Sequence, residues 1–231
     1  MSAKTMEAHI PSRQDGEQTR ERLLRIGLAL FAQQGFAKTS TREIAEAAHT
    51  NIAAISYYFG DKAGLYRAVF FESQGSPEKG MAGFSSEGLA LEQALRGFYA
   101  SFLEPLMQGE MARQCLKLHV REMIEPTGMW EEEISTGIRP MHEALVTVLC
   151  RHFSVASADD DVRRLAVCIA GLGVHMHVGR DVTDVIAPTL NAQANSFDLW
   201  LERLVMYALA MVDSEARRRA GAATALGAHE K

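Results

Sequence analysis

Hydroxyl and guanidinium groups stand side by side near the N-terminus of this chain, in the run Thr39, Ser40, Thr41 and Arg42. Hydroxyls bond phosphate oxygens, and an arginine fork fits the O6 and N7 acceptors of guanine. We therefore predict the three hydroxyl residues as phosphate contacts and Arg42 as the base contact of a DNA-binding surface. Arg42 also stands four residues before Glu46, so the alternative is an ion pair along a helix, worth a few tenths of a kcal/mol.

A second run with similar chemistry, NIAAISYYFGDK, occupies residues 51–62. Ile52, Ala53 and Ala54 are small or apolar, so they permit close approach to base edges and contact with thymine methyl groups. Tyr57, Tyr58 and Lys62 carry groups that reach phosphates, although either tyrosine could instead pack on a preceding helix. The full set of candidate DNA contacts is Thr39, Ser40, Thr41, Arg42, Asn51, Ile52, Ala53, Ala54, Ser56, Tyr57, Tyr58 and Lys62.

Helices must position these side chains. Leu24, Leu28 and Phe31 follow helical spacing on one face of a first helix, and Gly35 is expected to end it because glycine easily adopts the left-handed conformation. Ser40 and Glu43 have the spacing of a capping box, in which each side chain bonds a backbone N–H of the other residue. A second helix is therefore expected over about residues 41–48.

The residues that follow leave room only for a tight turn at 49–51. Asn51 is a good N-cap for a third helix over 52–59, and Asp61 can cap a fourth helix from residue 62. Two short helices joined by a tight turn and braced by a longer one have the layout of a helix-turn-helix module. In that layout the third helix enters the major groove while the second crosses the DNA backbone.

The stretch from Thr19 to Val69 resembles the N-terminal domain of the TetR family over its whole length. The matching sequences are LLRIGLALFAQQGF and TSTREIAEAAHTNIAAISYYFGDKAGLY. NIAAISYYF, together with LHVREMIEPTG at 118–128, is similar to the subgroup with a CerR-type (CecR-like) C-terminal domain. The resemblance implies an all-helical homodimer that represses promoters and releases DNA when it binds a small molecule. Many members have glycine where His49 stands and tyrosine where Ser56 stands.

The distribution of charge agrees with DNA contact at one end. The chain carries a net charge of −5, but residues 17–70 hold seven Lys/Arg against five Asp/Glu, and residues 71–231 hold fifteen against twenty-two. The positive balance is thus confined to the predicted helix-turn-helix module. No apolar run is long enough for a membrane helix and the N-terminus lacks an apolar signal core, so we expect a cytoplasmic protein without a membrane partner. The three scattered cysteines are expected to be free thiols.

The rest of the chain shows helical periodicity and almost no strand signal, so the predicted fold class is all-α. Residues 73–88, rich in Gly and Ser, predict a loop. Helices are expected over about 89–109 with a bend at Pro105, over 112–124, along 134–148, after a cap at Ser157 and Asp160, and after a cap at Asn195 and Asp198.

Four regions follow from these patterns. We predict a flexible arm (1–16), a helix-turn-helix DNA-binding domain (17–70), a helical-bundle ligand-binding and dimerisation domain (71–213), and a frayed or disordered tail (214–231). The tail is rich in Ala and Arg and has no apolar stripe.

The last two predicted helices carry apolar residues on more than one face, so more than one face must be buried. A second copy of the chain is the simplest partner, and paired DNA-binding modules would then need a palindromic operator with half-sites about 34–36 Å apart. The alternative is a helix at the centre of a single chain's core. The predicted dimer contacts are Val162, Leu165, Ile169, Leu172, Gly173, Met176, Phe197, Leu201, Leu204 and Ala208.

Methionine and aromatic residues are frequent in the middle helices. Methionine adapts to irregular shapes, which favours a pocket for an apolar small molecule, although ordinary core packing is the alternative for any one residue. Arg121 and Glu122 could form an ion pair beneath such a pocket. The candidate pocket residues are Phe98, Phe102, Met107, Met111, Leu118, Met123, Trp130, Met141 and His175.

Other chemistry finds little support in the sequence. Cys115 and His119 are four residues apart, but His175 and His177 are two apart and so lie on different faces of a helix. We expect no metal site and no cofactor. No motif of a nucleophilic triad or a phosphate-binding glycine loop is present, so we do not expect an enzyme. A small-molecule carrier with a vestigial DNA-binding module is the remaining alternative.

Overall fold

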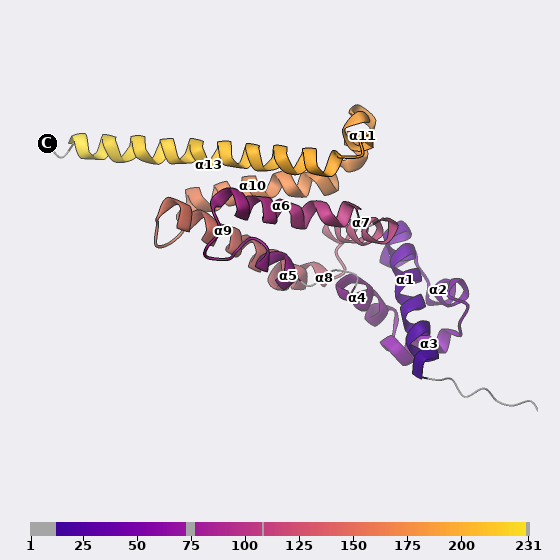
Figure 1. Cartoon of the computed structure of the whole chain (residues 1–231). Coiled ribbons are helices and arrows are strands. Elements are labelled where there is room, and N and C mark those ends of the chain that lie inside the picture. Colours follow the sequence, from indigo (N-terminus) through magenta and orange to yellow (C-terminus); the bar gives the residue numbers. More distant parts are fainter. Residues whose placement is uncertain (1–12, 73–76, 108, 230–231) are drawn as a thin grey trace, which may run out of the picture. The chain divides into compact units, whose positions relative to one another are not determined.

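The computed structural model describes residues 13–72, 77–107 and 109–229. Every regular element within these ranges is a helix, and no strand occurs in them, so the prediction of an all-α fold is confirmed. The chain divides into two compact units (Figure 1). The head unit comprises residues up to 74 and residues 114–127, and the body unit comprises residues 75–113 and those from 128 onward.

Four helices and the end of a fifth build the head unit: α1 (Arg13–Lys38), α2 (Thr41–Ala47), α3 (Ile52–Phe59), α4 (Lys62–Glu72) and the part of α7 (Glu110–Ile124) that begins at residue 114. Their apolar faces meet in one core, which includes the fully buried side chains of Phe31, Ile44, Ile55, Leu65 and Phe70. Residues 13–16 already belong to α1, so the predicted arm is too long by four residues, and its first twelve residues lie outside the described part.

The expected caps hold the ends of these helices. Gly35 has a φ of 80° and interrupts α1 as predicted. The Ser40 hydroxyl accepts the backbone N–H of Glu43, the Asn51 side chain accepts that of Ala53, and the Asp61 carboxylate accepts that of Gly64. These caps satisfy backbone donors that a helix leaves unpaired in its first turn. They fix where α2, α3 and α4 begin.

His49 lies in the tight turn between α2 and α3 with a φ of 51°. This is the left-handed region, in which the side chain of an L-residue meets the backbone and glycine does not. Many family members have glycine at this position, so the histidine of this chain holds the backbone in a strained conformation. The turn forms nevertheless, because the N–H groups of Ala48 and His49 bond back to carbonyls of α2.

The body unit contains nine described helical elements: α5 (Pro77–Ala82), α6 (Leu91–Met107), α8 (Met129–Glu133), the π-helical turn η1 (Ile134–Ile138), α9 (Arg139–Phe153), α10 (Asp160–Val178), α11 (Arg180–Ile186), α12 (Thr189–Ala192) and α13 (Ser196–His229). Helix α5 lies within the stretch that the sequence predicted as a loop, and Pro105 lies inside α6. Asp159 caps α10 by accepting the N–H of Val162, where Ser157 and Asp160 were expected to do so.

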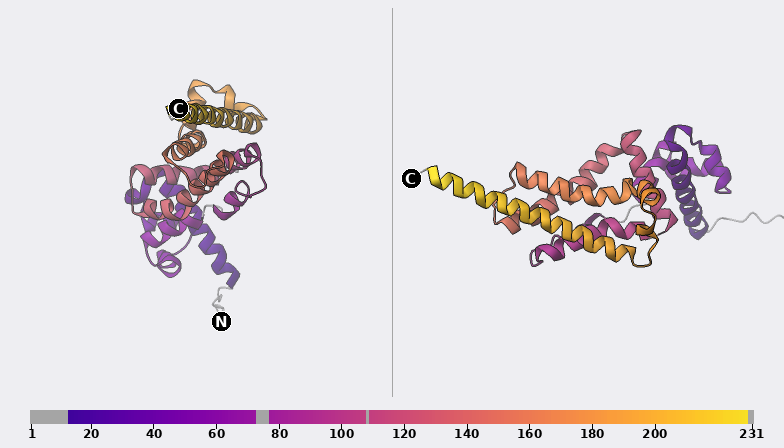
Figure 2. Two further views of the ribbon diagram at one scale, coloured as in Figure 1. Left: turned by 90° about the vertical axis from the view of Figure 1, so that its left-hand side faces the viewer. Right: turned by 90° about the horizontal axis from the view of Figure 1, so that it is seen from above.

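Helices α6, α9, α10 and α13 enclose the core of the body unit. Helix α13 runs alongside α10 and α6, as the views in Figures 1 and 2 agree. Leu95, Tyr99 and Ile169 are fully buried among these helices, and the Tyr99 hydroxyl donates to the Ile169 carbonyl at 3.0 Å. Burial raises the pKa of Tyr99, so this hydroxyl remains a donor.

The C-terminal segment differs from its prediction as a disordered tail, because α13 continues to His229. Arg219 donates to the Asp159 carboxylate at 2.7 Å and Arg218 donates to that of Asp161, so the helix is tied to the start of α10. Glu215 accepts from Arg218 within α13. Charge pairs stabilise this segment where it lacks an apolar stripe.

Among the described helices, none combines the length and the apolar character that a membrane-spanning helix needs.

Candidate nucleic-acid interface

Helix α3 presents one face to solvent and one to the head core. Ile55 is buried and anchors the helix, while Ile52, Ala53, Ser56 and Tyr57 are exposed on the opposite side. The Tyr57 side chain is 82% exposed, and its ring packs edge-on against Tyr58 with 4.8 Å between the ring centres. The structure thus brings four of the predicted contacts together on the helix that a helix-turn-helix module inserts into the major groove.

Two other residues of this run lie closer to the core than expected. Tyr58 is half-buried, and a Cβ added to Gly16 of α1 would lie only 3.1 Å from its hydroxyl. Tyr58 therefore packs on the first helix, which is the alternative that the sequence left open for the tyrosine pair. Ala54 is also half-buried, so it contributes to packing as well as to the surface.

The predicted row of hydroxyls before α2 divides into different roles. Thr39 is buried and its hydroxyl donates to the Gly35 carbonyl at 2.8 Å, so the prediction of a phosphate contact is wrong for this residue. Ser40 is exposed beside its cap, and Thr41 is half-buried at the first turn of α2. Hydroxyls and backbone N–H groups at such a helix start favour an anion such as a phosphate.

Arg42 projects from α2 with its side chain 83% exposed. Its Nε donates to the Glu46 carboxylate at 2.8 Å, so the ion pair that the spacing offered as an alternative does form. A pair this exposed contributes little free energy, because water screens it. The pair therefore leaves the guanidinium available for exchange onto a DNA acceptor.

Lys62 lies at the start of α4, three residues after α3 ends. Its ammonium lies 4.4 Å from the centre of the Phe36 ring, which holds the charge by a cation–π contact at the start of α4. Asn51 is exposed next to the α3 surface and is occupied as the N-cap of α3. The exposed candidates around the turn are therefore Ser40, Arg42, Asn51, Ile52, Ala53, Ser56 and Tyr57.

Sequence comparisons agree with this geometry. Residues 23–69 match the family described as "Bacterial regulatory proteins, tetR family". Residues 91–213, more than half of the chain, match the C-terminal domain of the HTH-type transcriptional dual regulator CecR. The chain belongs to the TetR family and has a CecR-type C-terminal domain. This family consists of transcriptional regulators rather than enzymes.

Individual relatives share only part of the TetR-family chain. CecR of Shigella flexneri is 31% identical over 145 residues, which is 58% of this chain and 64% of CecR. The probable regulator YttP of Bacillus subtilis (strain 168) is 44% identical over 54 residues, 23% of this chain and 26% of YttP. The chain therefore matches less than two thirds of the length of these relatives.

Solved TetR-type structures share the fold at low sequence identity. NalD, the secondary repressor of the MexAB-OprM multidrug efflux pump in Pseudomonas aeruginosa, has a TM-score of 0.57 at 21% identity, covering 83% of this chain and 96% of NalD. A TetR-like regulator from Rhodococcus sp. RHA1 has a TM-score of 0.56 at 20% identity, covering 86% and 98%. The prediction of a TetR-type fold is confirmed.

The C-terminal part of α7 belongs to the head unit of this TetR-family protein. The His119 ring stacks on Phe70 with 4.1 Å between the ring centres, and Arg121 donates to the Gln33 carbonyl at 3.3 Å. Arg121 pairs with Glu125 at 3.0 Å rather than with Glu122, so the ion pair suggested from the sequence does not form. The LHVREMIEPTG motif thus supplies packing for α1 and α4.

Most of the predicted pocket residues do not line the cavity of the body unit, and the effector site itself stays a prediction. A cavity of about 320 Å³ lies in the body unit, and of the nine candidates only Met107 lines it. Phe98 is buried in the core, whereas Met111 and Met123 are exposed, and Leu118 and Met123 belong to the head unit. The candidates that do not line the cavity are Phe98, Phe102, Met111, Leu118, Met123, Trp130, Met141 and His175.

Eight of the ten predicted dimer contacts are buried within the single chain. Val162, Ile169 and Ala208 have no exposed area, so they cannot contact a second chain. The stripe chosen from the sequence is the monomer core, which is the alternative that was left open. Two of the ten predicted contacts, Leu172 and Phe197, are half-buried. The buried ones are Val162, Leu165, Ile169, Gly173, Met176, Leu201, Leu204 and Ala208.

Within the described residues, no cluster of three or more His, Cys, Asp or Glu is arranged to hold a metal ion. The His119 Nδ1 lies 2.7 Å from the Cys115 carbonyl oxygen and 3.8 Å from its sulfur, so this pair makes a contact within α7. Cys115 is buried, Cys150 half-buried and Cys168 exposed, all as free thiols.

Proposed function

We propose that this TetR-family protein is a sequence-specific transcriptional regulator that binds double-stranded DNA through α2 and α3. The observation that carries the proposal is the solvent-exposed face of α3. The side chains exposed on it are Ile52, Ala53, Ser56 and Tyr57. Apolar and hydroxyl groups on one narrow helix suit thymine methyls and base edges in the major groove. Arg42 on α2 adds a fork for guanine.

Selection of binding sites from random double-stranded DNA tests this proposal. We expect enrichment of a palindrome with half-sites one helical turn apart, and an affinity that falls by about tenfold or more between 50 and 200 mM salt, because phosphate contacts release counterions. The Tyr57→Ala variant should lose the enrichment while keeping the helical content of the parent. Retention of random DNA with no sequence preference would contradict the proposal.

The active form is proposed to be a homodimer built on the outer faces of α10 and α13. Val167, Val174 and Val178 form an exposed apolar stripe on α10, and Met206 and Tyr207 are exposed on α13. Exposed apolar side chains gathered on one face commonly mark a protein–protein interface. A two-fold axis through these helices would bury the exposed apolar residues of α10 and α13 in both copies. It would also present two copies of α3 to one palindrome.

Repression with release by a small effector is the proposed mode of regulation. The resemblance to the TetR family supports it, and the body unit contains a cavity large enough for a small molecule. The related protein CecR is named a dual regulator, so the test must allow both signs. A reporter gene placed behind the selected operator should be silenced by the protein, and activation of the reporter would overturn the repressor assignment.

A further inference from the structure

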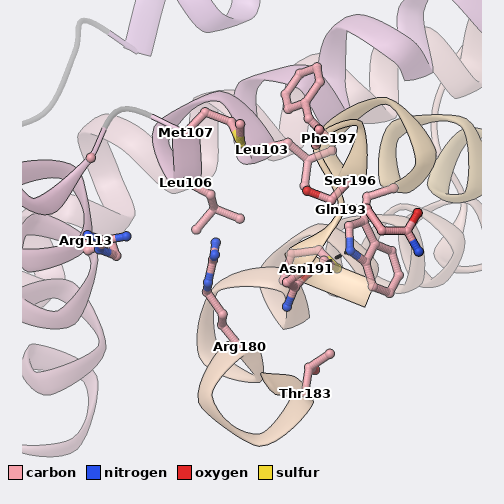
Figure 3. A pocket seen from close by; sticks show the side chains of 14 residues that line it. Leu103, Leu106, Met107, Arg113, Arg180, Thr183, Asn191, Gln193, Ser196 and Phe197 are labelled. Atoms are coloured by element: carbon pink, nitrogen blue, oxygen red, sulfur yellow. Dashed lines mark hydrogen bonds between the residues drawn. The ribbon is translucent and has the colours of Figure 1, made fainter. Parts of the chain in front are cut away.

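The cavity of the body unit lies at the end where α6 and α10 finish and α13 begins (Figure 3). Its walls come from the ends of α6 and α10, the first residues of α7, the short helices α11 and α12, and the start of α13. All its lining residues belong to the body unit, so one compact unit contains the whole site. Its volume of about 320 Å³ is at the small end of ligand pockets, which run from about 300 to 1,000 Å³.

One part of the lining is apolar. Leu103, Leu106 and Met107 come from α6, Met176 from α10, and Trp200 from α13. Leu103 and Leu106 are nearly fully buried, while Met107 is 59% exposed at the rim. An alkyl chain or an aromatic ring placed against these side chains would remove apolar surface from water, which is favourable.

The other part of the lining is cationic. Arg113 of α7 and Arg180 of α11 both contribute their side chains, and in Figure 3 Arg180 points toward Leu106. The lining contains no Asp or Glu. Arg113 is paired with Glu110 at 2.9 Å, and Arg180 with Asp184 at a looser 3.7 Å, and these acids stand outside the lining. A ligand in the cavity therefore meets guanidinium groups and no carboxylate.

Neutral hydrogen-bonding groups complete the polar side. The Asn191 side chain accepts from the Trp200 indole N–H at 2.9 Å and donates to Asp184 at 2.6 Å, which fixes the wall between the apolar and the cationic parts. Asp184 accepts from Asn191 through Oδ1, while its Oδ2 lies 3.7 Å from the Arg180 Nε, which is too long for a hydrogen bond. The Arg180 side chain is only 30% exposed, so its charge is screened less than one in open water.

We infer that this cavity binds an amphipathic anion: a carboxylate on an alkyl or aryl tail, with the carboxylate on Arg180 and Arg113 and the tail on Leu103, Leu106 and Trp200. A carboxylate accepts two parallel N–H bonds from a guanidinium, which a neutral or cationic head group cannot do. The volume limits the ligand to a small one. The inference rests on the proposed function for its regulatory effect, but the binding itself does not depend on DNA.

Tryptophan fluorescence of the full chain tests the head-group preference. The protein has two tryptophans, and only Trp200 lines the cavity, so the Trp130→Phe variant reports from the site alone. The probes are octanoate, 1-octanol and octylammonium, and 4-phenylbutyrate with its alcohol. We expect both carboxylates to change the Trp200 emission and to bind about tenfold or more tighter than the alcohols, with no response to octylammonium. Equal affinity for alcohol and acid, or no response to either acid, would overturn the inference.

Charge-removing variants locate the head group. Arg180→Gln and Arg113→Gln should each weaken octanoate binding by about tenfold and leave octanol binding unchanged, because they remove a charge and keep most of the side-chain volume. Arg217→Gln, an exposed residue of α13 outside the lining, is the matched control. Calorimetric titration of the same variants measures the affinity without relying on fluorescence, so a change in emission that is unrelated to binding does not mislead. Unchanged octanoate affinity in both cavity variants would reject the assignment.

DNA release is measured separately on the parent protein and its selected operator. Release by octanoate that Arg180→Gln abolishes supports both proposals together. Carboxylate binding without any operator recognition would leave this inference standing and remove the proposed function. Operator recognition without carboxylate binding would leave the proposed function standing and overturn this inference.

Discussion

The Glu122 carboxylate and the Tyr66 hydroxyl lie 2.8 Å apart in the buried core of the head unit, joining α7 to α4. The other carboxylate oxygen accepts the backbone N–H of Thr127 at 2.6 Å, and the Thr127 hydroxyl bonds the same group. Burial, and next the neighbouring carboxylate, raise the pKa of Tyr66 far above its ordinary range, so the tyrosine remains a donor. A buried carboxylate is tolerated here because donors surround it.

Replacing Glu122 by Gln should lower the free energy of unfolding by about 1–3 kcal/mol. The amide has one acceptor oxygen where the carboxylate has two. Its NH₂ group therefore either faces the Thr127 N–H, which can only donate, or donates to the Tyr66 hydroxyl and takes away the acceptor of that hydroxyl's proton. Urea denaturation measures the change. Glu125→Gln, in an exposed pair with Arg121, is the control and should stay within about 0.5 kcal/mol of the parent. Equal effects of the two substitutions would contradict the role of Glu122.

The stability of the protein should fall as the pH drops from about 7.5 to 5.5, in part through His119. Burial lowers the pKa of His119 in the folded chain, while in the unfolded chain it stays near about 6.5. The unfolded state therefore binds more protons below that pH, and acid favours it. His119→Phe, which keeps the ring on Phe70, should flatten the pH dependence of the urea midpoint. His152→Phe at an exposed site should leave it as steep as in the parent.

Relief of the strained turn should stabilise the head unit. His49→Gly removes a side chain from a position with a φ of 51°, and we expect a gain of about 0.5–1 kcal/mol once the extra freedom of glycine in the unfolded chain is subtracted. Thermal denaturation would show this as a higher midpoint. His152→Gly, at an exposed helical position in α9, should instead destabilise by about 1 kcal/mol. A lower midpoint for His49→Gly would show that the imidazole makes a compensating contact.

Arg42→Ala should reduce discrimination for the selected operator by about 1–3 kcal/mol while leaving the free energy of unfolding nearly unchanged. The exposed pair with Glu46 contributes little to folding, so the loss belongs to DNA recognition. Competition mobility shifts against operators altered one base pair at a time measure this. Arg217→Ala in the body unit is the control. An unaltered preference at every position would exclude Arg42 as the base contact.

Val174→Glu should convert the proposed dimer to monomers, because it places a charge in the middle of the exposed apolar stripe of α10. Sedimentation velocity at micromolar concentration gives the mass directly. Thr147→Glu on the exposed side of α9 adds the same charge away from that stripe and should not alter the assembly. A dimer that survives the Val174 change would place the interface on other helices.

The sequence by itself determined the features that depend on neighbouring residues. Ser40, Asn51 and Asp61 cap the helices that follow them, because a cap needs only a side chain within three residues of its donor. Gly35 interrupts the first helix by its own left-handed conformation. The motif residues between Thr19 and Val69 also identified the family, and helical periodicity without a strand signal predicted the all-α fold.

Only the tertiary structure decided which apolar face turns inward and where the cavity lies. Val162 and Val167 stand on the same helix with equal hydrophobicity, yet one is fully buried and the other is 60% exposed, because α6 and α13 cover one side of α10. Thr39 was read as a surface hydroxyl and is buried. Arg113 and Arg180 are 67 positions apart and line one cavity only because several helix ends converge, which no local pattern records.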